Sequence, residues 1–421
     1  MKNYLILVAG IIFLASCRAG KTGRTLPGRD PALFTGVLVT DAHTGKTLFS
    51  QHSETPFVPA SNTKILTLYA CMSTLGDSIP AFRYFTRRDT LFLLGTGDPT
   101  LLHPDFPESA ALPLMKKAKV IVISGQNQQQ ASYGAGWAWD DYNDYYQAEI
   151  SSLPVYGNVV RAAQQNGQLV LRPGYFPLKD SLINHSKIQR EPGENIFYHH
   201  PIAQRSLEFS QEIPFRTGFD LTARLLADTL KVPVIHRHFE ITEPLKTAYS
   251  QPVDTVLRKM MQQSDNLLAE QLLLLAGGTL SDTLSTAVSI RHLSRLLLSD
   301  ITLPYRWVDG SGLSRYNLFS PQIMVYILDK MYRTFPQERL FSLMSIGGKA
   351  GTLRNKYKSS PVPYVFAKTG SMSGVYNESG FLLSRSGRLL TYSVMKNNFT
   401  GTTAENGRKT MELMEEIRRR Y

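Results

Sequence analysis

Cysteine is almost absent from this sequence, which has 2 in 421 residues, Cys17 and Cys71. A framework of several disulfides, of the kind that stabilises small secreted domains, is therefore excluded. Charged residues make up 19% of the chain and hydrophobic residues 43%, which excludes a mostly disordered protein. The length leaves room for two or three domains with a sizeable buried core.

Long apolar runs are absent after the first residues. The segment from Tyr4 to Ala15 is almost continuously apolar and follows the positive Lys2, but it is shorter than the roughly 20 residues that a membrane-spanning helix needs. It ends in Leu14-Ala15-Ser16-Cys17, which resembles a bacterial lipobox. The sequence thus predicts a signal peptide over residues 1–16 and a lipid on Cys17, with a plain signal peptide and an incidental cysteine as the alternative.

A polar, flexible tether is expected over residues 17–30. Such a protein is held at a membrane by its lipid and does not span the bilayer. The residues after Cys17, Arg18-Ala19, lack an aspartate retention signal, which favours the outer membrane. The expected location is the periplasm, and the oligomeric state stays open.

Acidic residues are few, because 34 Asp and Glu face 46 Lys and Arg, which gives a formal charge of +12. The positive charges are scattered, and an exported lipoprotein does not meet nucleic acid, so a nucleic-acid partner is not expected. An anionic polymer of the cell envelope is compatible with this charge. The 9 His have no Cys or carboxylates at ligand spacing beside them, so neither a metal nor another cofactor is expected.

Strand-like and helix-like segments occupy different parts of the chain. Strands are expected towards both ends, and amphipathic helices follow residue 252. Between them, short strand-like runs alternate with Gly, Pro, Asn and Asp. We therefore expect an α+β fold in which residues 31–82 and 246–421 build one antiparallel sheet flanked by helices. Residues 83–245 are expected to form a β-rich inserted domain.

The tetrapeptide Ser61-Asn62-Thr63-Lys64 lies at the start of the first strong apolar helix. Residues i and i+3 share a helix face, so the amine of Lys64 is expected beside the hydroxyl of Ser61. A neutral amine there can take the hydroxyl proton and make Ser61 a nucleophile. The same pattern in Ser393 to Lys396 falls on an expected strand, where i and i+3 point to opposite faces, and is interpreted as structural.

A polar triplet, Ser264-Asp265-Asn266, separates two amphipathic helices. This position suits a junction exposed to a cleft, although a solvated turn is the simpler interpretation of the motif alone. The similar triplet Tyr156-Gly157-Asn158 lies in the inserted region and is interpreted as a turn.

A cationic triplet, Lys368-Thr369-Gly370, follows an expected strand over residues 364–367. A cation at a sheet edge beside Thr369 and Ser371 can receive a carboxylate, and Gly370 allows a substrate backbone to approach closely. The same triplet at residues 21–23 lies in the tether, where nothing holds it in a site.

The ordered combination of Ser-x-x-Lys, Ser-x-Asn and Lys-Thr-Gly resembles the signature of the penicillin-recognising serine enzymes. The spacing from Ser61 to Ser264 is 264 − 61 = 203 residues, far more than in a compact β-lactamase. The chain is similar to the D-alanyl-D-alanine carboxypeptidase/endopeptidase family of low-molecular-mass penicillin-binding proteins (class C), which carry inserted domains here. The inserted region is shorter than in the largest members. Further segments that resemble this family are residues 93–100, 136–141, 309–317, 351–353 and 379–381.

The resemblance implies a serine transpeptidase/β-lactamase-like fold that cleaves D-Ala-D-Ala peptides of peptidoglycan through an acyl-enzyme and is inhibited by β-lactams. It implies that Ser61 attacks the carbonyl, that Lys64 is the base and that Ser264 relays a proton to the leaving amine. Lys64 must then be partly neutral, and burial and a second cation are expected to lower its pKa. The backbone N–H groups of Ser61 and Ser371 would bind the oxyanion. The implied substrate-binding residues are Asn266, Lys368, Thr369, Gly370 and Ser371.

Two alternatives remain beside this interpretation. A β-lactamase would use the same nucleophile with rapid deacylation, and a catalytically silent wall-binding module would keep only the fold. The aromatic and acidic segment around Trp137, Trp139 and residues 142–146 is open to two interpretations. It could face a sugar, but packing in the core of the inserted domain is favoured.

Overall fold

The two ends of the chain meet in one antiparallel sheet, as the sequence predicts. In the computed structural model, which describes residues 34–107, 109–183, 186–201 and 208–421, the first strand pairs with the last from Phe34↔Asn397 to Asp41↔Leu390. In spatial order the sheet contains β14 (Ser345–Ile346), β15 (Val365–Met372), β16 (Val375–Leu383), β17 (Leu389–Asn397), β1 (Phe34–Asp41) and β2 (Thr47–Gln51).

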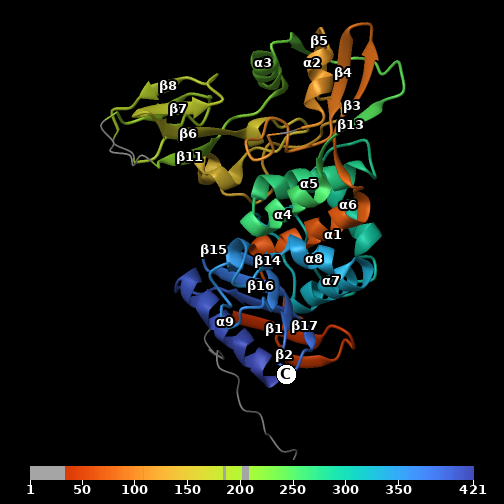
Figure 1. Ribbon diagram of the computed structural model, residues 1–421, viewed down its shortest axis with the longest axis vertical. Coiled ribbons are helices and arrows are strands. Elements are labelled where there is room, and N and C mark those ends of the chain that lie inside the picture. Colours follow the sequence, from red (N-terminus) through yellow and green to blue (C-terminus); the bar gives the residue numbers. More distant parts are fainter. Residues whose placement is uncertain (1–33, 108, 184–185, 202–207) are drawn as a thin grey trace, which may run out of the picture.

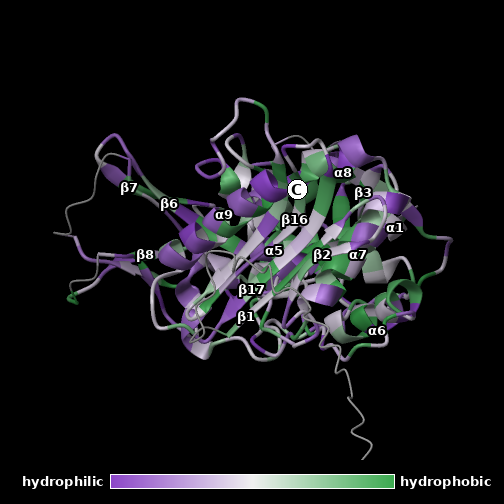
Figure 2. Cartoon of the chain, turned by 90° about the horizontal axis from the view of Figure 1, so that it is seen from below, coloured by the Kyte–Doolittle hydropathy of each residue, from purple (hydrophilic) through white to green (hydrophobic). Residues whose placement is uncertain are grey.

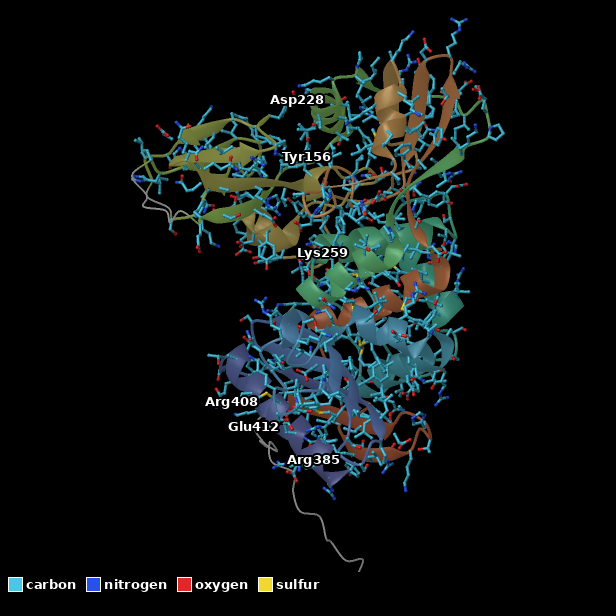
Figure 3. All side chains as sticks on the ribbon, in the orientation of Figure 1. Tyr156, Asp228, Lys259, Arg385, Arg408 and Glu412 are labelled. Carbon is cyan, nitrogen blue, oxygen red and sulfur yellow. The ribbon has the colours of Figure 1, made fainter. Side chains whose placement is uncertain are left out.

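One face of this sheet is covered by the C-terminal helix α9 (Thr403–Arg420) (Figure 1). The helix begins where the side chain of Thr402 accepts a hydrogen bond from the backbone N–H of Glu405, and cations fill its last turn, where they complement the helix dipole. Its buried Leu413 joins residues of β1 and β17 in one apolar cluster. Its outer face is hydrophilic (Figure 2), and Arg408 and Glu412 lie on it (Figure 3).

The opposite face of the sheet meets a layer of helices, which lies in the middle of Figure 1. These helices are α1 (Lys64–Thr74), α4 (Val253–Gln263), α5 (Asn266–Gly278), α6 (Thr286–Leu297), α7 (Pro321–Thr334) and α8 (Gln337–Leu343). Residues 267–277 of α5 are all buried, which is the property of a helix that is apolar nearly all round. The N-termini of α1 and α5 lie close together, so the helical layer brings Lys64 and Asn266 to one site.

Among its described residues, the inserted region contains three further sheets and two α-helices. The largest sheet has the order β12 (Val234–His236), β5 (Val120–Ser124), β4 (Thr90–Gly95), β3 (Ser78–Arg87) and β13 (Lys246–Pro252). One smaller sheet has the order β11 (Ser210–Pro214), β6 (Val159–Gln165) and β7 (Gln168–Arg172). The other has the order β8 (Leu178–Asp180), β10 (Phe197–His199) and β9 (Gln189–Arg190). The helices are α2 (Leu112–Lys117) and α3 (Phe219–Leu230).

The largest inserted sheet reaches beyond the segment that we expected to be inserted. Its strand β3 begins at Ser78 and its strand β13 ends at Pro252, a few residues outside the limits of 83 and 245. The helix α3, which sequence patterns did not indicate, packs on this sheet beside β12. The polar side chain of Gln271, on α5, bonds backbone groups of Gly97 and Ser151, so the inserted region is fixed to the helical layer.

Residues 1–33 lie outside the described part of the chain, and the predicted signal peptide, lipidated Cys17 and tether fall within them. Across the described residues, none of the helices has the length and apolar character needed to cross a membrane. The other cysteine, Cys71, is buried in α1 and is not in a disulfide.

Candidate active site

The nucleophile candidate Ser61 stands in the 3₁₀ turn η1 (Ala60–Thr63), which runs directly into α1. The turn is set by Ala60, whose φ of 46° is left-handed and unusual for a residue with a side chain. One turn later, Nζ of Lys64 lies 3.1 Å from Oγ of Ser61. The predicted i, i+3 pair is therefore present in the structure.

The amine of Lys64 is fully buried and has three partners. It donates to Oδ1 of Asn266 at 2.6 Å and to the carbonyl of Ser311 at 2.7 Å, and its third contact is Oγ of Ser61. A neutral amine has two N–H groups and one lone pair. These three contacts match it, since the two carbonyl oxygens take the N–H groups and the lone pair is left for the hydroxyl proton of Ser61.

Burial lowers the pKa of Lys64 to about 8, although the carboxylates of Glu270, Asp309 and Asp265 act in the opposite direction. The sequence prediction that burial lowers this pKa agrees with the structure. We also expected a second cation to lower the pKa of Lys64. The structure shows this effect on Lys368 instead, because burial and the charge of Lys64 hold the pKa of Lys368 well below its usual range. The amine of Lys64 can therefore exchange protons near neutral pH.

The second motif lies at the predicted junction between α4 and α5. Ser264 ends α4 with a left-handed φ of 61°, and Asp265 caps α5 by accepting the backbone N–H of Leu268 at 2.9 Å. This cap starts α5 at Asn266, whose amide Nδ2 donates to the carbonyl of Tyr146 in the inserted region at 3.0 Å. The junction faces the cleft and is not the solvated turn that we also considered, whereas Tyr156–Asn158 forms the short turn η4, as predicted.

The third motif lies within a strand, so the prediction that it follows one is wrong. Register pairing between β15 and β16 continues from Val365 to Met372 and includes all of Lys368-Thr369-Gly370. Nζ of Lys368 is buried and donates to Oγ of Ser264 at 2.8 Å and to the carbonyl of Thr369 at 2.7 Å. Lys368 thus orients Ser264 directly, and the hydroxyls of Thr369 and Ser371 line the open cleft.

Gly370 permits a close approach of backbone, but of the protein's own backbone and not of the substrate backbone that the sequence suggested. A Cβ at this position would lie 2.6 Å from the carbonyl oxygen of Pro59 and 2.9 Å from the backbone nitrogen of Ser61. The backbone that approaches is therefore the turn η1, which carries Ser61. The absent side chain lets β15 and η1 pack together and brings two of the three motifs into one site.

The motifs open into a cleft of about 670 Å³. The inserted region closes one side of it, so both parts of the chain line the same space. The lining includes Ser61, Ser264, Asn266, Thr369 and Ser371 from the motifs and Asp140, Asp141, Tyr145 and Tyr146 from the inserted region. A second cavity, of about 610 Å³ at the other ends of α1 and α5, is lined by residues outside the three motifs.

Two buried carboxyl groups beside Lys64 were missed at the sequence level. Both oxygens of Glu270 accept backbone N–H groups, from Gly310 at 3.0 Å and Ser311 at 2.8 Å. Asp309 accepts from Gly312 and also from the indole of Trp137 at 3.0 Å. A signal for Glu270 was present, because it follows Asn266 by four residues and so shares its helix face.

The aromatic segment of the inserted region is only partly packed. Trp137 is half-buried against Asp309, but Trp139 is 85% exposed and Tyr145 is 63% exposed. The favoured interpretation, packing in the core, is therefore wrong for Trp139. Within the described residues, no group of three or more His, Cys, Asp or Glu side chains is placed to hold a metal ion.

The second Ser-x-x-Lys match has the structural role that was predicted. Ser393 accepts a hydrogen bond from Ser379 at 2.8 Å, and Ser379 in turn accepts from the amide of Asn62 at 2.7 Å. This buried chain of side chains holds the residue after the nucleophile. Lys396 points instead to the backbone of Asn406 in α9.

Comparison with known proteins agrees with this geometry. The model of the D-Ala-D-Ala carboxypeptidase 3 (S13) family matches residues 28–171 and 221–420. The chain belongs to this family. As an S13 protein, it is a serine-type D-Ala-D-Ala carboxypeptidase/endopeptidase.

Relatives of this S13 protein are distant but align along most of its length. The D-alanyl-D-alanine carboxypeptidase DacB of Haemophilus influenzae is 23% identical over 447 residues, which cover 92% of this chain and 90% of the relative. The penicillin-sensitive carboxypeptidase A of Dictyostelium discoideum is 23% identical over 403 residues, covering 80% of this chain and 76% of the relative.

Solved structures share the fold of this S13 protein. Penicillin-binding protein 4 from Haemophilus influenzae superposes with a TM-score of 0.73 at 20% identity, over 92% of this chain and 96% of that chain. A predatory peptidoglycan endopeptidase from Bdellovibrio bacteriovorus gives a TM-score of 0.51 at 15% identity, over 91% and 92% of the two chains. The predicted serine transpeptidase/β-lactamase-like fold is thereby confirmed.

Proposed function

We propose that this S13 protein cleaves D-Ala-D-Ala peptide bonds of peptidoglycan through an acyl-enzyme on Ser61. The contact between the buried amine of Lys64 and Oγ of Ser61 carries the proposal, since it joins a base to a nucleophile in an open cleft. In acylation, the O–H bond of Ser61 breaks as its proton moves to Lys64. Oγ then forms a bond to the carbonyl carbon of the scissile peptide.

Expulsion of the leaving amine requires a proton, and Ser264 is suited to relay it. Its hydroxyl faces the cleft and is oriented by Nζ of Lys368. The proton taken from Ser61 thus ends on the leaving amine as the C–N bond breaks, and Lys64 becomes neutral again. A water molecule then attacks the ester, with Lys64 as the base, and Ser61 is regenerated.

The terminal carboxylate of the substrate would bind at the cleft side of β15. The hydroxyls of Thr369 and Ser371 line that side, while Lys368 contributes positive potential when protonated. Asn266 would bind the amide of the substrate, and the N–H groups of Ser61 and Ser371 would stabilise the oxyanion. One such preorganised donor is worth about 3–4 kcal/mol of transition-state stabilisation.

Two incubations test this proposal. A fluorescent penicillin should label the wild-type protein and leave the Ser61→Ala variant unlabelled. Purified muropeptides, with products identified by mass, should lose a terminal D-Ala or be cut at a cross-link. Absence of labelling of the wild type would favour the silent wall-binding module instead.

A β-lactamase is the second function with the same nucleophile. The 203-residue separation of Ser61 and Ser264 and the match to the S13 family both weigh against it. Steady-state hydrolysis of a chromogenic cephalosporin distinguishes the two. A stable acyl-enzyme with very slow turnover is expected here.

The proposed location is the periplasm, with a lipid on Cys17 as the membrane anchor. The support is the apolar run that ends in Leu14-Ala15-Ser16-Cys17 and a substrate that lies outside the cytoplasm. Metabolic labelling with an alkyne fatty acid should mark the wild type but not Cys17→Ser. Separation of the two membranes should place the labelled protein in the outer one.

A further inference from the structure

Glu270 is a buried carboxyl group one helical turn beyond Asn266. It is 0% exposed, and its two oxygens accept the N–H groups of the consecutive residues Gly310 and Ser311. An uncompensated buried carboxylate is costly, and these two donors offset part of that cost. A glutamine at this position could accept only one of them, because its amide nitrogen is a donor.

The backbone that Glu270 holds is the one that contacts the base. The carbonyl of Ser311 accepts an N–H from Lys64 at 2.7 Å. The preceding carbonyl, of Gly310, accepts from the hydroxyl of Thr67 at 2.7 Å. A Cβ at Gly310 would lie 2.6 Å from the carbonyl oxygen of Ala269, so this backbone lies directly against α5. Glu270 is therefore linked to the amine of Lys64 through a single residue, Ser311.

The charges that face Lys64 come from three elements. Glu270 and its neighbour Asp265 belong to α5 and its cap, Asp309 to the loop before Ser311, and Lys368 to β15. Burial and Asp309 raise the pKa of Glu270, whereas the hydrogen bonds from Gly310 and Ser311 act in the opposite direction and favour the carboxylate, which in turn raises the pKa of Lys64. Proton uptake by the two groups is thus coupled, and a titration of the site reports the pair.

We propose that Glu270 is a positioning residue for acylation, which holds the Ser311 carbonyl against Lys64 and provides the counter-charge for the ammonium that forms there. This inference rests on the proposed function of Lys64 as the base. When the O–H bond of Ser61 breaks and the N–H bond forms on Lys64, a positive charge appears in a buried place. The carboxylate of Glu270 stabilises that charge without touching the substrate.

The test is the pH dependence of acylation by a fluorescent penicillin in the full-length protein. Without the counter-charge, the ammonium form of Lys64 is less stable, so neutral amine persists to lower pH. The acid limb is the part of the rate profile in which the rate rises with pH. In Glu270→Gln, this limb should therefore move to lower pH by about one unit. The plateau rate at high pH should fall several-fold, because the amine is a weaker base.

Two further variants separate charge from packing. Glu270→Asp keeps the charge and should leave the midpoint of the limb within about 0.3 pH unit of the wild type, with a lower plateau. Asp329→Asn removes a partly buried carboxylate on α7, whose pKa is raised to about 6 by burial, and should not move the limb. If Glu270→Gln does not fold, Glu270→Asp keeps the inference falsifiable, because a shift of its midpoint by about one pH unit would overturn it.

A purely structural role would lower the rate by the same factor at every pH. An unmoved limb in Glu270→Gln, or a one-unit shift in Glu270→Asp, therefore overturns the inference. Both outcomes leave the proposed function intact, provided that the wild type is acylated. An unlabelled wild type would instead contradict the proposed function itself.

Discussion

At the scale of single residues, the contact between Lys64 and Ser61 leads to the first prediction. Lys64→Ala should lower acylation by a fluorescent penicillin at least about 100-fold, since general-base assistance is worth 10²–10⁴-fold. The fold should persist, because the change removes a buried amine that is costly to ionise. Circular dichroism and thermal melting check the fold, and gel fluorescence checks acylation.

The second Ser-x-x-Lys match supplies the control for that prediction. Ser393→Ala should still be labelled, because Ser393 acts only through the hydrogen-bond chain from Asn62. Full labelling of Lys64→Ala would contradict the role of the amine. If the two single variants Ser393→Ala and Lys64→Ala both lose labelling, any change in this part of the core abolishes acylation, and the loss in Lys64→Ala says nothing specific about the amine.

The pKa of Lys64 leads to a second prediction, for the wild type. The active form is the neutral amine, so the acylation rate should rise with pH through about 8 and then level off. At pH 6 only about one molecule in a hundred has this form, and the rate should be about 50-fold below that at pH 8. Stopped-flow fluorescence across this range measures it, and a flat profile would mean that Lys64 is not the titrating base.

How far the sequence predicts the site depends on how local each contact is. Ser61 and Lys64 are one helical turn apart, so their spacing alone predicts that they meet. The carbonyl of Ser311 reaches Lys64 from 247 residues further along the chain. Residues 309–317 resemble the family, but their pattern does not predict this contact, and the role proposed for Glu270 depends on it.

At the scale of elements, the contact between β15 and η1 leads to a third prediction. Gly370→Ala would place a Cβ 2.6 Å from Pro59 and 2.9 Å from Ser61, so either β15 or the turn must shift. Overpacking of this kind costs about 1–3 kcal/mol. Acylation should fall far more than stability, because the shift moves the proposed nucleophile, Ser61, relative to the N–H groups proposed to bind the oxyanion.

Gly193 is the matched control, since a Cβ there meets nothing within 4 Å and its φ is not left-handed. Gly193→Ala should leave both melting temperature and labelling unchanged. If Gly370→Ala labels at the wild-type rate, β15 does not position the nucleophile. Equal losses in both variants would point to a general sensitivity of the fold.

The strand β15 also shows where patterns of residues mislead. Lys368, Thr369 and Ser371 are polar, so the strand was expected to end at residue 367. The pairing continues because Lys368 is buried under the cleft and the hairpin turns only at Gly374, where φ is +73°. The prediction for Trp139 was wrong in the opposite sense, since this aromatic residue was expected in the core and is exposed.

At the scale of the whole molecule, the sequence predicts the sheet better than the docking of the inserted region. Strands near both ends with helices between leave few ways to build one antiparallel sheet. The docking depends instead on polar contacts between distant segments, such as the ion pair between Asp105 and Lys259, labelled on α4 in Figure 3. The bond from Asn266 to Tyr146 brings the inserted region into the active site.

The last prediction concerns this docking. Gln271 is fully buried and its amide pairs with three backbone groups, the carbonyls of Gly97 and Ser151 and the N–H of Ser151. Gln271→Leu keeps a similar volume but leaves these groups unpaired, at a cost of about 1–3 kcal/mol each. The wild type should melt in one transition, and the variant should melt several degrees lower, at roughly 2–4 °C per kcal/mol.

Acylation should weaken in the same variant, because α5 carries Asn266 five residues before Gln271 and loses part of its attachment to the inserted region. Lys119→Ala removes an exposed ion pair with Asp89 and should change neither property, since such pairs contribute little. Calorimetry and penicillin labelling measure both. An unchanged melting temperature in Gln271→Leu would mean that the inserted region and the helical layer fold independently. The shape of the cleft would then not depend on the hydrogen bonds of Gln271.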